Sequence, residues 1–460
     1  MHMSDVMYKA FANIESDTLA LPAIIDLFSG CGGFGTGFDS AGFSIAAGID
    51  FDAASSQTAG YNLHERYGER HGQHVADLTD ISLSDIPLKK STTGYIVIGG
   101  PPCQAYSRAG RGKLRSLGGH HLDDPRGSLY EDYVRLCLEI GVEGVVMENV
   151  PESLDYGGVN IPETICEMFE KEGYATGWTV LNAADYGVPQ VRERMILMAM
   201  KKEICEEISF PPPTHRSILN LPTSWSARRK KFIDCTHFKL PREQPGELKP
   251  WVTVQEALSD LPVLFPLPTT KYMLLQPNIT KPYKTSPAND FQRAMRQWYG
   301  EDSGVVSGNS FRNTIRDFPI FHRMKPGDDF RNVAEISEQM LEEDCIACGL
   351  VKPKHGAQRQ MKRDKIVPPY DREKFHEKWK RLSPDKPAHT LPAHLGTDTY
   401  SHIHPWEPRG ISVREAARLQ SFPDDFLFQC SMSEAFKQIG NAVPPLLAKR
   451  ISEHVKTFFL

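Results

Sequence analysis

The chain lacks long apolar runs. No stretch approaches the roughly 20 apolar residues that a membrane-spanning helix needs. The first five residues, Met1–Asp5, also lack the basic segment followed by an apolar one that marks a secretion signal. We therefore expect a cytoplasmic protein, with no membrane partner.

A disulfide framework is also missing. The nine cysteines are odd in number and mostly stand apart, which is typical of free thiols in a reducing compartment. Cys345 and Cys348 have the spacing of half a zinc site, and Cys235 and His237 are distant candidates for the other half. Because no second pair stands at normal spacing, we expect no bound metal.

Internal repeats and low-complexity tracts are lacking as well. A content of 40% apolar and 24% charged residues excludes a disordered chain, and 460 residues suffice for two or three domains. The net charge of −5 argues against a generic polyanion binder. However, residues 211–250 hold eight Lys or Arg against three acids, and residues 351–381 hold eleven against four. This basic middle indicates either a phosphate-binding face or a solvated lysine-rich surface.

Strand-like and helix-like segments alternate in the first half of the chain. The predicted strands cover residues 23–28, 44–50, 95–100, 144–150, 176–181 and 195–200. The predicted helices cover residues 53–65, 129–140 and 165–172. This alternation predicts an α/β fold built on a Rossmann-like, doubly wound parallel sheet.

The alternation ends near Phe210–Pro213, which reads as a stiff linker. The chain then becomes rich in proline, polar and basic residues, with helix candidates only at 254–261 and 333–343. Order returns near the end, where Ser412 and Glu415 predict a capping box for a helix over 412–420, and a last helix is expected over 441–459. We predict three parts, with boundaries at 1–205, 206–400 and 401–460, and we expect the last helix to pack on the first part.

A glycine-rich turn follows the first predicted strand, in the run Asp26–Phe38. Glycines there let the backbone approach a ligand, and the following helix N-terminus favours its polar or anionic part. Asp50 stands twenty residues after Gly30, at the end of the second predicted strand, where an acid can bind ribose hydroxyls. Because the strict G-x-G-x-x-G pattern is absent, the turn predicts a nucleoside cofactor without specifying a nicotinamide one. A tight turn that serves only packing is the alternative.

Two other predicted strands end in reactive side chains. Cys103 follows the strand at 95–100 after two prolines, and Glu148 lies near the end of the strand at 144–150. Open α/β sheets bind ligands at this edge. A thiol and a carboxyl group together suit attack on an electron-poor ring. The alternatives are a buried, inert cysteine and a structurally paired carboxylate.

These segments resemble, in order, the motif series of the DNA (cytosine-5) methyltransferase family. The matching stretches are a cofactor motif, a nucleophile motif, an acid motif, an arginine motif, a structural motif and two closing segments, at residues 26–34, 100–107, 148–150, 190–194, 381–390, 414–424 and 440–445. Within this family the first part of the chain would be the catalytic and cofactor-binding domain. The second would be a smaller, loop-rich target-recognition domain, and the third a hinge and closing helix.

The resemblance implies methyl transfer from S-adenosylmethionine to carbon 5 of a flipped-out cytosine in a specific duplex DNA sequence, through a covalent cysteine adduct. The catalytic residues that it implies are Cys103, Glu148, Arg192 and Arg194. The cofactor-binding residues that it implies are Phe28, Gly30, Gly32, Asp50, Phe51, Asp77, Pro102, Asn441 and Val443.

The stretch at 104–127 carries glycines and arginines, and we expect it to close over the flipped base and contact phosphates. An ordinary exposed loop is the alternative. The DNA-binding residues implied here are Gln104, Ser107, Arg108, Arg111 and Arg115.

The resemblance further implies a bacterial-type, cytoplasmic enzyme that belongs to a restriction-modification or phage-defence system, with a companion restriction endonuclease. We expect a monomer. Three alternatives stay open: a tRNA cytosine-5 methyltransferase, a non-catalytic DNA-binding protein, and a nicotinamide oxidoreductase. The long basic middle favours DNA over tRNA. The presence of Cys103, Glu148 and Arg194 argues against a protein without catalysis.

Overall fold

The structure is a computed structural model of the whole chain. It describes residues 21–68, 72–78, 88–101, 129–218, 225, 228–242, 246–265, 280–312, 316–350, 355–371, 378–397 and 399–460. None of the helices within these ranges is long and apolar enough to cross a bilayer.

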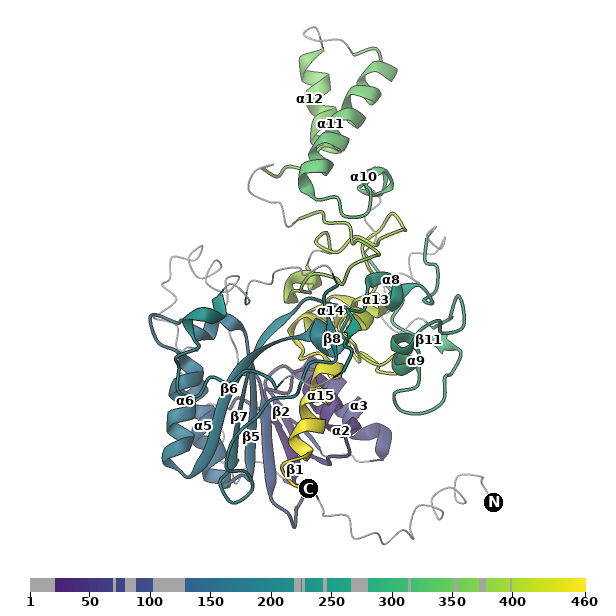
Figure 1. The fold of residues 1–460 in the computed structure, drawn as a ribbon. Coiled ribbons are helices and arrows are strands. Elements are labelled where there is room, and N and C mark those ends of the chain that lie inside the picture. The colour runs from purple at the N-terminus through teal and green to yellow at the C-terminus, as the bar shows by residue number, and fades with distance from the viewer. Residues whose placement is uncertain are drawn as a thin grey trace, which may run out of the picture.

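One seven-stranded sheet forms the centre of the molecule, with strand order β3-β2-β1-β4-β5-β7-β6 (Figure 1). The strands are β1 (Ala23–Leu27), β2 (Ile45–Asp50), β3 (Gln73–Val75), β4 (Tyr95–Gly99), β5 (Gly144–Asn149), β6 (Tyr174–Asn182) and β7 (Glu193–Lys201). The strand order reverses between β1 and β4, so these two strands define the switch point where doubly wound sheets bind ligands. The predicted α/β, doubly wound fold is confirmed.

The sheet is mixed, and the prediction of wholly parallel strands is wrong for β7. This strand runs antiparallel to both β5 and β6. The connection from β6 to β7 spans only residues 183–192 and includes the short 3-10 helix η6 (Ala183–Tyr186). A parallel crossover needs a dozen or more residues, so this short connection makes a hairpin.

Helices cover both faces of the sheet. On one face α5 (Leu129–Ile140) and α6 (Ile161–Lys171) pack against the apolar side chains of β1, β4 and β5. On the other face lie α2 (Gly33–Ser40) and α15 (Pro445–Lys456), with α3 (Ala53–Leu63) beside α2. The cores on the two faces are both fully buried, which fixes the carboxyl ends of the strands in place.

The closing helix packs on the first part of the chain, as predicted. A Cβ atom on Gly37 would lie 2.3 Å from the Cβ of Ala448, so glycine alone permits this approach of α2 and α15. The predicted start of this helix is wrong, because Asn441 ends α14 (Met432–Asn441) and a new helix begins at Pro445. Prolines lack the amide hydrogen and disfavour a helical residue before them, which explains the break.

The middle of the chain contains short elements joined by long loops. These are β8 (His215–Arg216), η7 (Arg229–Lys231), β9 (Lys249–Pro250), α8 (Val254–Leu258), β10 (Lys281–Pro282), α9 (Asp290–Arg296), β11 (Val305–Val306), α10 (Phe318–Arg323), α11 (Phe330–Ala347) and α12 (Gly356–Ile366). The helices predicted near 254 and 333 are confirmed as α8 and part of α11. Helices α11 and α12 form a hairpin that projects from the molecule (Figure 1).

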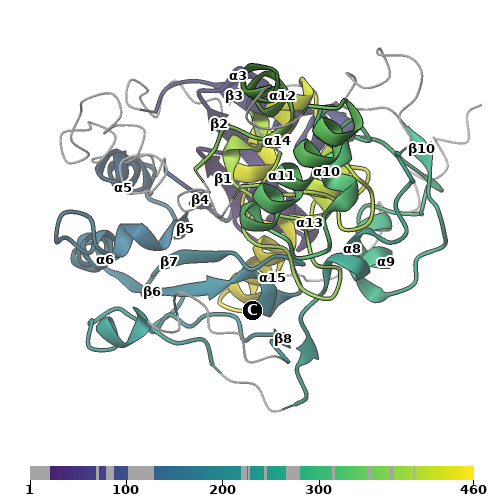
Figure 2. The same ribbon diagram turned by 90° about the horizontal axis from the view of Figure 1, so that it is seen from above.

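The chain after the hairpin returns over the carboxyl ends of the strands, where α13 (Val413–Leu419) and α14 lie next to α8 (Figure 2). The predicted capping box is confirmed, since the Ser412 hydroxyl accepts from the Glu415 amide and the Glu415 carboxylate accepts from the Ser412 amide. The division of the chain into three functional parts stays a prediction.

Candidate active site

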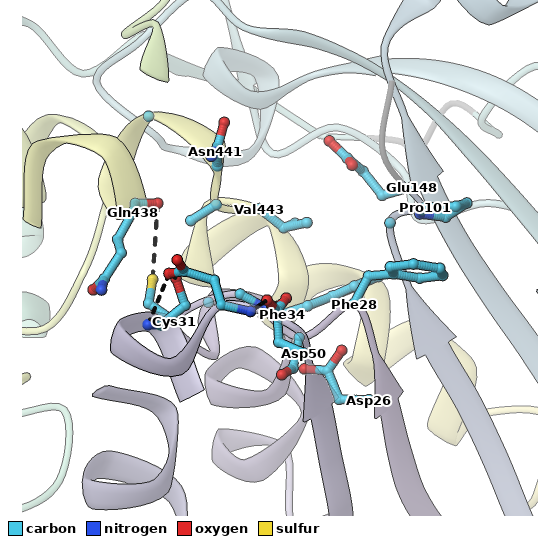
Figure 3. A pocket seen from close by; sticks show the side chains of 18 of the residues that line it. Asp26, Phe28, Cys31, Phe34, Asp50, Pro101, Glu148, Gln438, Asn441 and Val443 are labelled. Carbon is cyan, nitrogen blue, oxygen red and sulfur yellow. Dashed lines mark hydrogen bonds between the residues drawn. The ribbon is translucent and has the colours of Figure 1, made fainter. Parts of the chain in front are cut away.

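A cavity opens at the carboxyl ends of β1, β2, β4 and β5 (Figure 3). Its volume of about 260 Å³ is far more than one water molecule needs, so it can hold a ligand. Segments that lie far apart in the sequence line it. They come from within residues 26–34, 50–55, 100–101, 148–150 and 437–443, together with Arg192 and Arg194. The fold therefore brings together the first and last predicted motifs.

The turn after β1 has unusual backbone geometry. Phe28 and Gly30 both have positive φ angles, of 58° and 54°, and both line the cavity. A bulky residue such as phenylalanine rarely adopts this conformation, and such strain clusters at functional sites. Gly32, with φ of 89°, is not among the residues that line the cavity, and a Cβ atom on it would lie 2.9 Å from Cδ1 of Leu63. This glycine therefore serves the packing of α2 on α3.

Asp50 ends β2 with its carboxylate held by the chain. One oxygen accepts from the Gly30 amide and the other from the Asp52 amide, both at 2.8 Å. Burial raises the pKa of Asp50, while these two amides oppose the shift. Phe51 is 66% exposed at the rim, so its ring is free to stack on a ligand. Asp77 lies outside the lining, and its assignment to the cofactor stays a prediction.

Asp26 is a lining residue that the sequence did not single out. Its side chain is 1% exposed, and neither carboxylate oxygen meets hydrogen-bond geometry with any described residue. Burial raises the pKa of Asp26 well above its ordinary value, and the charge of Asp50 adds to this, while the nearby Gly35 amide opposes it. A buried, unsatisfied carboxyl group is costly, so this one indicates a cationic ligand. The sequence signal that could have identified Asp26 is the presence of an acid within an otherwise apolar predicted strand.

Glu148 and Arg194 form an ion pair at the other end of the cavity. The Nε of Arg194 lies 2.7 Å from Oε1 of Glu148, and both side chains are largely buried. A Cβ on Gly100 would lie 3.0 Å from Oε2 of Glu148, so the glycine after β4 leaves room for this carboxylate. The sequence predicted both residues for the site, and the structure places them together there.

Asn149 links the acid motif to the nucleophile motif. Its Nδ2 donates to the Pro101 carbonyl at 3.3 Å, and its Oδ1 accepts from the Val150 amide at 2.8 Å. Pro101 lines the cavity and is the last described residue before Cys103 in the sequence. The contact therefore fixes the point from which the chain continues to the cysteine.

Arg192 has a different environment from Arg194. It is 1% exposed, and it donates to the carbonyls of Leu391, Gly440 and Ala442 at 3.0, 2.9 and 3.2 Å. It thereby holds the segment that carries Asn441 and Val443 against the cavity. These contacts give Arg192 a positioning role, and its assignment to the catalytic residues stays a prediction, since it also lines the cavity.

Several predicted residues lie outside the described part of the chain. They are Pro102, Cys103, Gln104, Ser107, Arg108, Arg111 and Arg115, together with the predicted closing stretch at 104–127.

One group of buried side chains has the spacing of metal ligands. Within the described residues the only such group is His404, Glu407 and Glu415. The guanidinium of Arg409 already pairs with both carboxylates, at 3.1 and 2.7 Å, which accounts for their charge without a metal. The cysteines near residue 345 are not part of this group.

A doubly wound sheet whose strand ends surround a glycine turn, an aspartate after β2 and a buried acid-arginine pair is typical of α/β enzymes that bind their ligands at the carboxyl ends of the strands. The chain matches the C-5 cytosine-specific DNA methylase family over residues 23–457, and it belongs to that family. It is therefore a DNA cytosine methyltransferase.

Several relatives agree with this assignment. A protein of Oceanobacillus iheyensis that carries the type II methyltransferase name M.OihORF3336P is 49% identical, covering 98% of each chain. The type II methyltransferase M.AgeI of Thalassovita gelatinovora is 30% identical, covering 94% of this chain and 98% of its own. A crystal structure described as a DNA modification methyltransferase from an E. coli prophage has a TM-score of 0.60 at 22% identity, over 95% of this chain and 99% of its own, which supports the fold.

Proposed function

We propose that this enzyme transfers a methyl group from S-adenosylmethionine to carbon 5 of a flipped-out cytosine in a specific duplex DNA sequence, through a covalent adduct with Cys103. The observation that carries the proposal is one cavity lined at one end by Asp26, Asp50 and Phe51 and at the other by Glu148 and Arg194. A cofactor and a base could meet only in such a shared space.

The lining residues fit this cofactor. Asp26 would face the positive charge of the sulfonium or ammonium group, Asp50 would accept from the ribose hydroxyls, and Phe51 would cover the adenine. Asn441 and Val443 would close the cavity from the far end of the chain. Asp77 and the backbone of Pro102 would complete the adenine site. The cofactor supplies an electrophilic methyl group when it is bound.

The opposite end fits a cytosine ring. Glu148 would bind ring nitrogen 3 and the exocyclic amine, and Arg194 would donate to the carbonyl oxygen. The ion pair between these two side chains orients both. Cys103 follows Pro101 by two residues, which supports a position near the same ring.

The chemistry follows from these placements. The Cys103 thiolate would add to carbon 6, and the displaced electron pair would make carbon 5 nucleophilic toward the methyl group. Glu148 would donate a proton to ring nitrogen 3 as the thiolate adds, which neutralises the negative charge on the ring, and it would take this proton back when Cys103 leaves. Loss of the carbon-5 proton and expulsion of Cys103 would then restore the aromatic ring and the free enzyme.

The target base must leave the helix, which costs about a few kcal/mol. The stretch at 104–127 would close over the flipped base, with Gln104, Ser107, Arg108, Arg111 and Arg115 at the DNA. Residues 206–400 would read the sequence in the major groove. The type II names of the relatives support a role in restriction-modification, with a companion restriction endonuclease. We propose that the enzyme acts as a monomer.

The test is methyl transfer from labelled cofactor to duplex DNA and, in parallel, to tRNA. We expect incorporation into DNA alone, lost in Cys103→Ser, and bisulfite sequencing of DNA from expressing cells should map a single recognition sequence. Incorporation into tRNA alone would support the tRNA alternative. Calorimetric binding of a nicotinamide cofactor in place of S-adenosylmethionine would overturn the proposal.

A further inference from the structure

Four consecutive cations, Arg228 to Lys231, lie in the basic middle of the chain and have no role in the chemistry above. Arg228 is half-buried, whereas Arg229, Lys230 and Lys231 are exposed and make up η7. A charged run of this kind is often only a solvated surface. Its attachments in the folded chain argue for a function.

The first attachment joins this segment to the arginine motif. The backbone amide of Trp225 donates to both carboxylate oxygens of Glu193, at 2.9 and 3.2 Å. Glu193 begins β7 and stands between Arg192 and Arg194 in the sequence. Trp225, three residues before the first of the four cations, is therefore fixed at the end of the sheet where Arg194 enters the cavity.

The second attachment joins the segment to the acid motif. Nη2 of Arg228 donates to the Pro151 carbonyl at 3.3 Å. Pro151 begins η5 (Pro151–Leu154), directly after Val150, which lines the cavity. The segment is thus attached to the chain that leaves Glu148 as well as to the chain that enters Arg194.

The residues that follow are anchored on the sheet. The Phe232 ring stacks on Trp225, with ring centroids 5.7 Å apart. The chain then pairs with the edge strand β6, where the Trp178 amide donates to the His237 carbonyl at 2.9 Å. His237 also contacts Glu163 and Glu170 through its two ring nitrogens, at 2.9 and 3.1 Å. These contacts hold the cations on a fixed base.

The three exposed cations also keep their charge unneutralised. Among the residues that the structure describes, Arg229, Lys230 and Lys231 form no ion pair with an acid. Other cations of the same region are paired: Lys239 lies 3.1 Å from Glu207, and Lys249 lies 3.1 Å from Asp290. Three unpaired cations on one turn, attached to the chain segments that lead into and out of the cavity, are complementary to the negative charge of a nucleic-acid backbone.

We infer that Arg229, Lys230 and Lys231 bind the phosphates of the DNA strand that carries the target cytosine, and so hold that strand at the mouth of the cavity. The inference rests on the proposed function, because it requires that DNA approach Glu148. Arg228 acts as the anchor that places the other three.

The experiment compares the triple variant Arg229→Gln, Lys230→Gln, Lys231→Gln with a control that removes the same charge elsewhere. The control variant is Lys90→Gln, Lys171→Gln, Lys202→Gln, whose three exposed lysines lie at the amino edge of the sheet. Affinity for a duplex that contains the mapped site, and for a scrambled duplex, is measured over a series of salt concentrations.

We expect the slope of log affinity against log salt to become shallower by about two to three in the first variant, and to change little in the control. Affinity should fall by the same factor for both duplexes, because phosphate contacts carry no sequence information. Cofactor binding and the thermal unfolding midpoint should stay unchanged. A variant with Arg229→Lys, Lys230→Arg and Lys231→Arg should keep the wild-type slope.

Equal slopes in the wild type and the first variant would overturn the inference, as would a loss confined to the duplex with the mapped site. If the triple variant fails to fold, the single variant Lys230→Gln should lower the slope by about one. These outcomes are distinct from failure of the proposed function, in which the wild-type enzyme itself would not methylate DNA.

Discussion

The cavity and the segment that packs α13 on α8, here called the hinge, both bury charged side chains, but they pair them to different extents. In the hinge, Arg418 is fully buried between Asp260 and Asp424, with a 3.0 Å contact to Asp260. Arg409 is equally buried and pairs with two glutamates. In the cavity, by contrast, Asp26 has no partner among the described residues, and Glu148 has one cation at the edge of open space.

The difference separates structure from function. A buried charge whose hydrogen bonds are complete stabilises or specifies the fold, and it has no capacity left for a ligand. A buried charge with unused capacity costs free energy that a bound ligand can offset. We therefore expect the buried charges of the cavity to act on a ligand, and those of the hinge to stabilise the packing of α13 on α8.

The largest expected effect comes from Glu148→Gln. The amide cannot give a proton to ring nitrogen 3 as the thiolate adds, so the methyl transfer rate should fall by about 100-fold to 10,000-fold. The matched control is Glu143→Gln, which removes a half-buried pair with Lys201 just before β5 and should keep the rate. Equal rates in Glu148→Gln and the wild type would remove Glu148 from the chemistry.

Arg418→Met tests the hinge. Asp260 and Asp424 would lose their shared cation and keep only the contacts with Arg296 at 3.3 Å and Arg414 at 4.0 Å, which should lower the free energy of unfolding by up to about 3–5 kcal/mol. Arg194→Met should cost much less stability, because Glu148 faces the cavity, yet it should impair methyl transfer. Urea unfolding of both variants measures the difference. A reversed order of stability would contradict the comparison.

Gly37→Ala tests the packing of the closing helix. The added methyl group would overlap Ala448 and the Lys449 backbone, so the free energy of unfolding should fall by about 1–3 kcal/mol. Gly356→Ala at the start of α12 is the control, since a Cβ there meets nothing within 4 Å. That change should be neutral or stabilise the protein by up to about 1 kcal/mol. Equal effects would show that α2 and α15 do not pack closely.

The smallest effect is expected from Asp26→Asn in the absence of cofactor. Because burial raises the folded-state pKa of Asp26, the wild type is favoured at low pH, and it loses stability as the pH rises from about 4 through that pKa. The asparagine variant escapes this loss, so its stability relative to the wild type should grow between pH 4 and pH 7. S-adenosylmethionine should then stabilise the variant less than the wild type. A difference that does not change with pH would show that Asp26 is not strained by burial.

Much of this arrangement was predictable from the sequence, because it depends on local patterns. Runs of apolar residues predicted the strands, and the positions of Glu148 and Arg194 at strand ends predicted that both belong to the site. The antiparallel direction of β7 follows from the short connection between β6 and β7, and the pattern of apolar residues within the strands carries no information about that direction. The contacts of Arg192 could not be foreseen, since its partners lie about 200 to 250 residues further along the chain. Asp26 was not predicted as a site residue because a single acid within an apolar strand also occurs in strands that have no functional role.

The most direct test of the central claim is covalent trapping at Cys103. A duplex with 5-fluorocytosine at the mapped target blocks loss of the group at carbon 5, so the adduct cannot be released. With S-adenosylmethionine present, we predict a protein–DNA complex that survives denaturing electrophoresis, with the DNA on Cys103 by mass spectrometry and no complex in Cys103→Ser. Folded, cofactor-bound enzyme that yields no such complex would contradict the account.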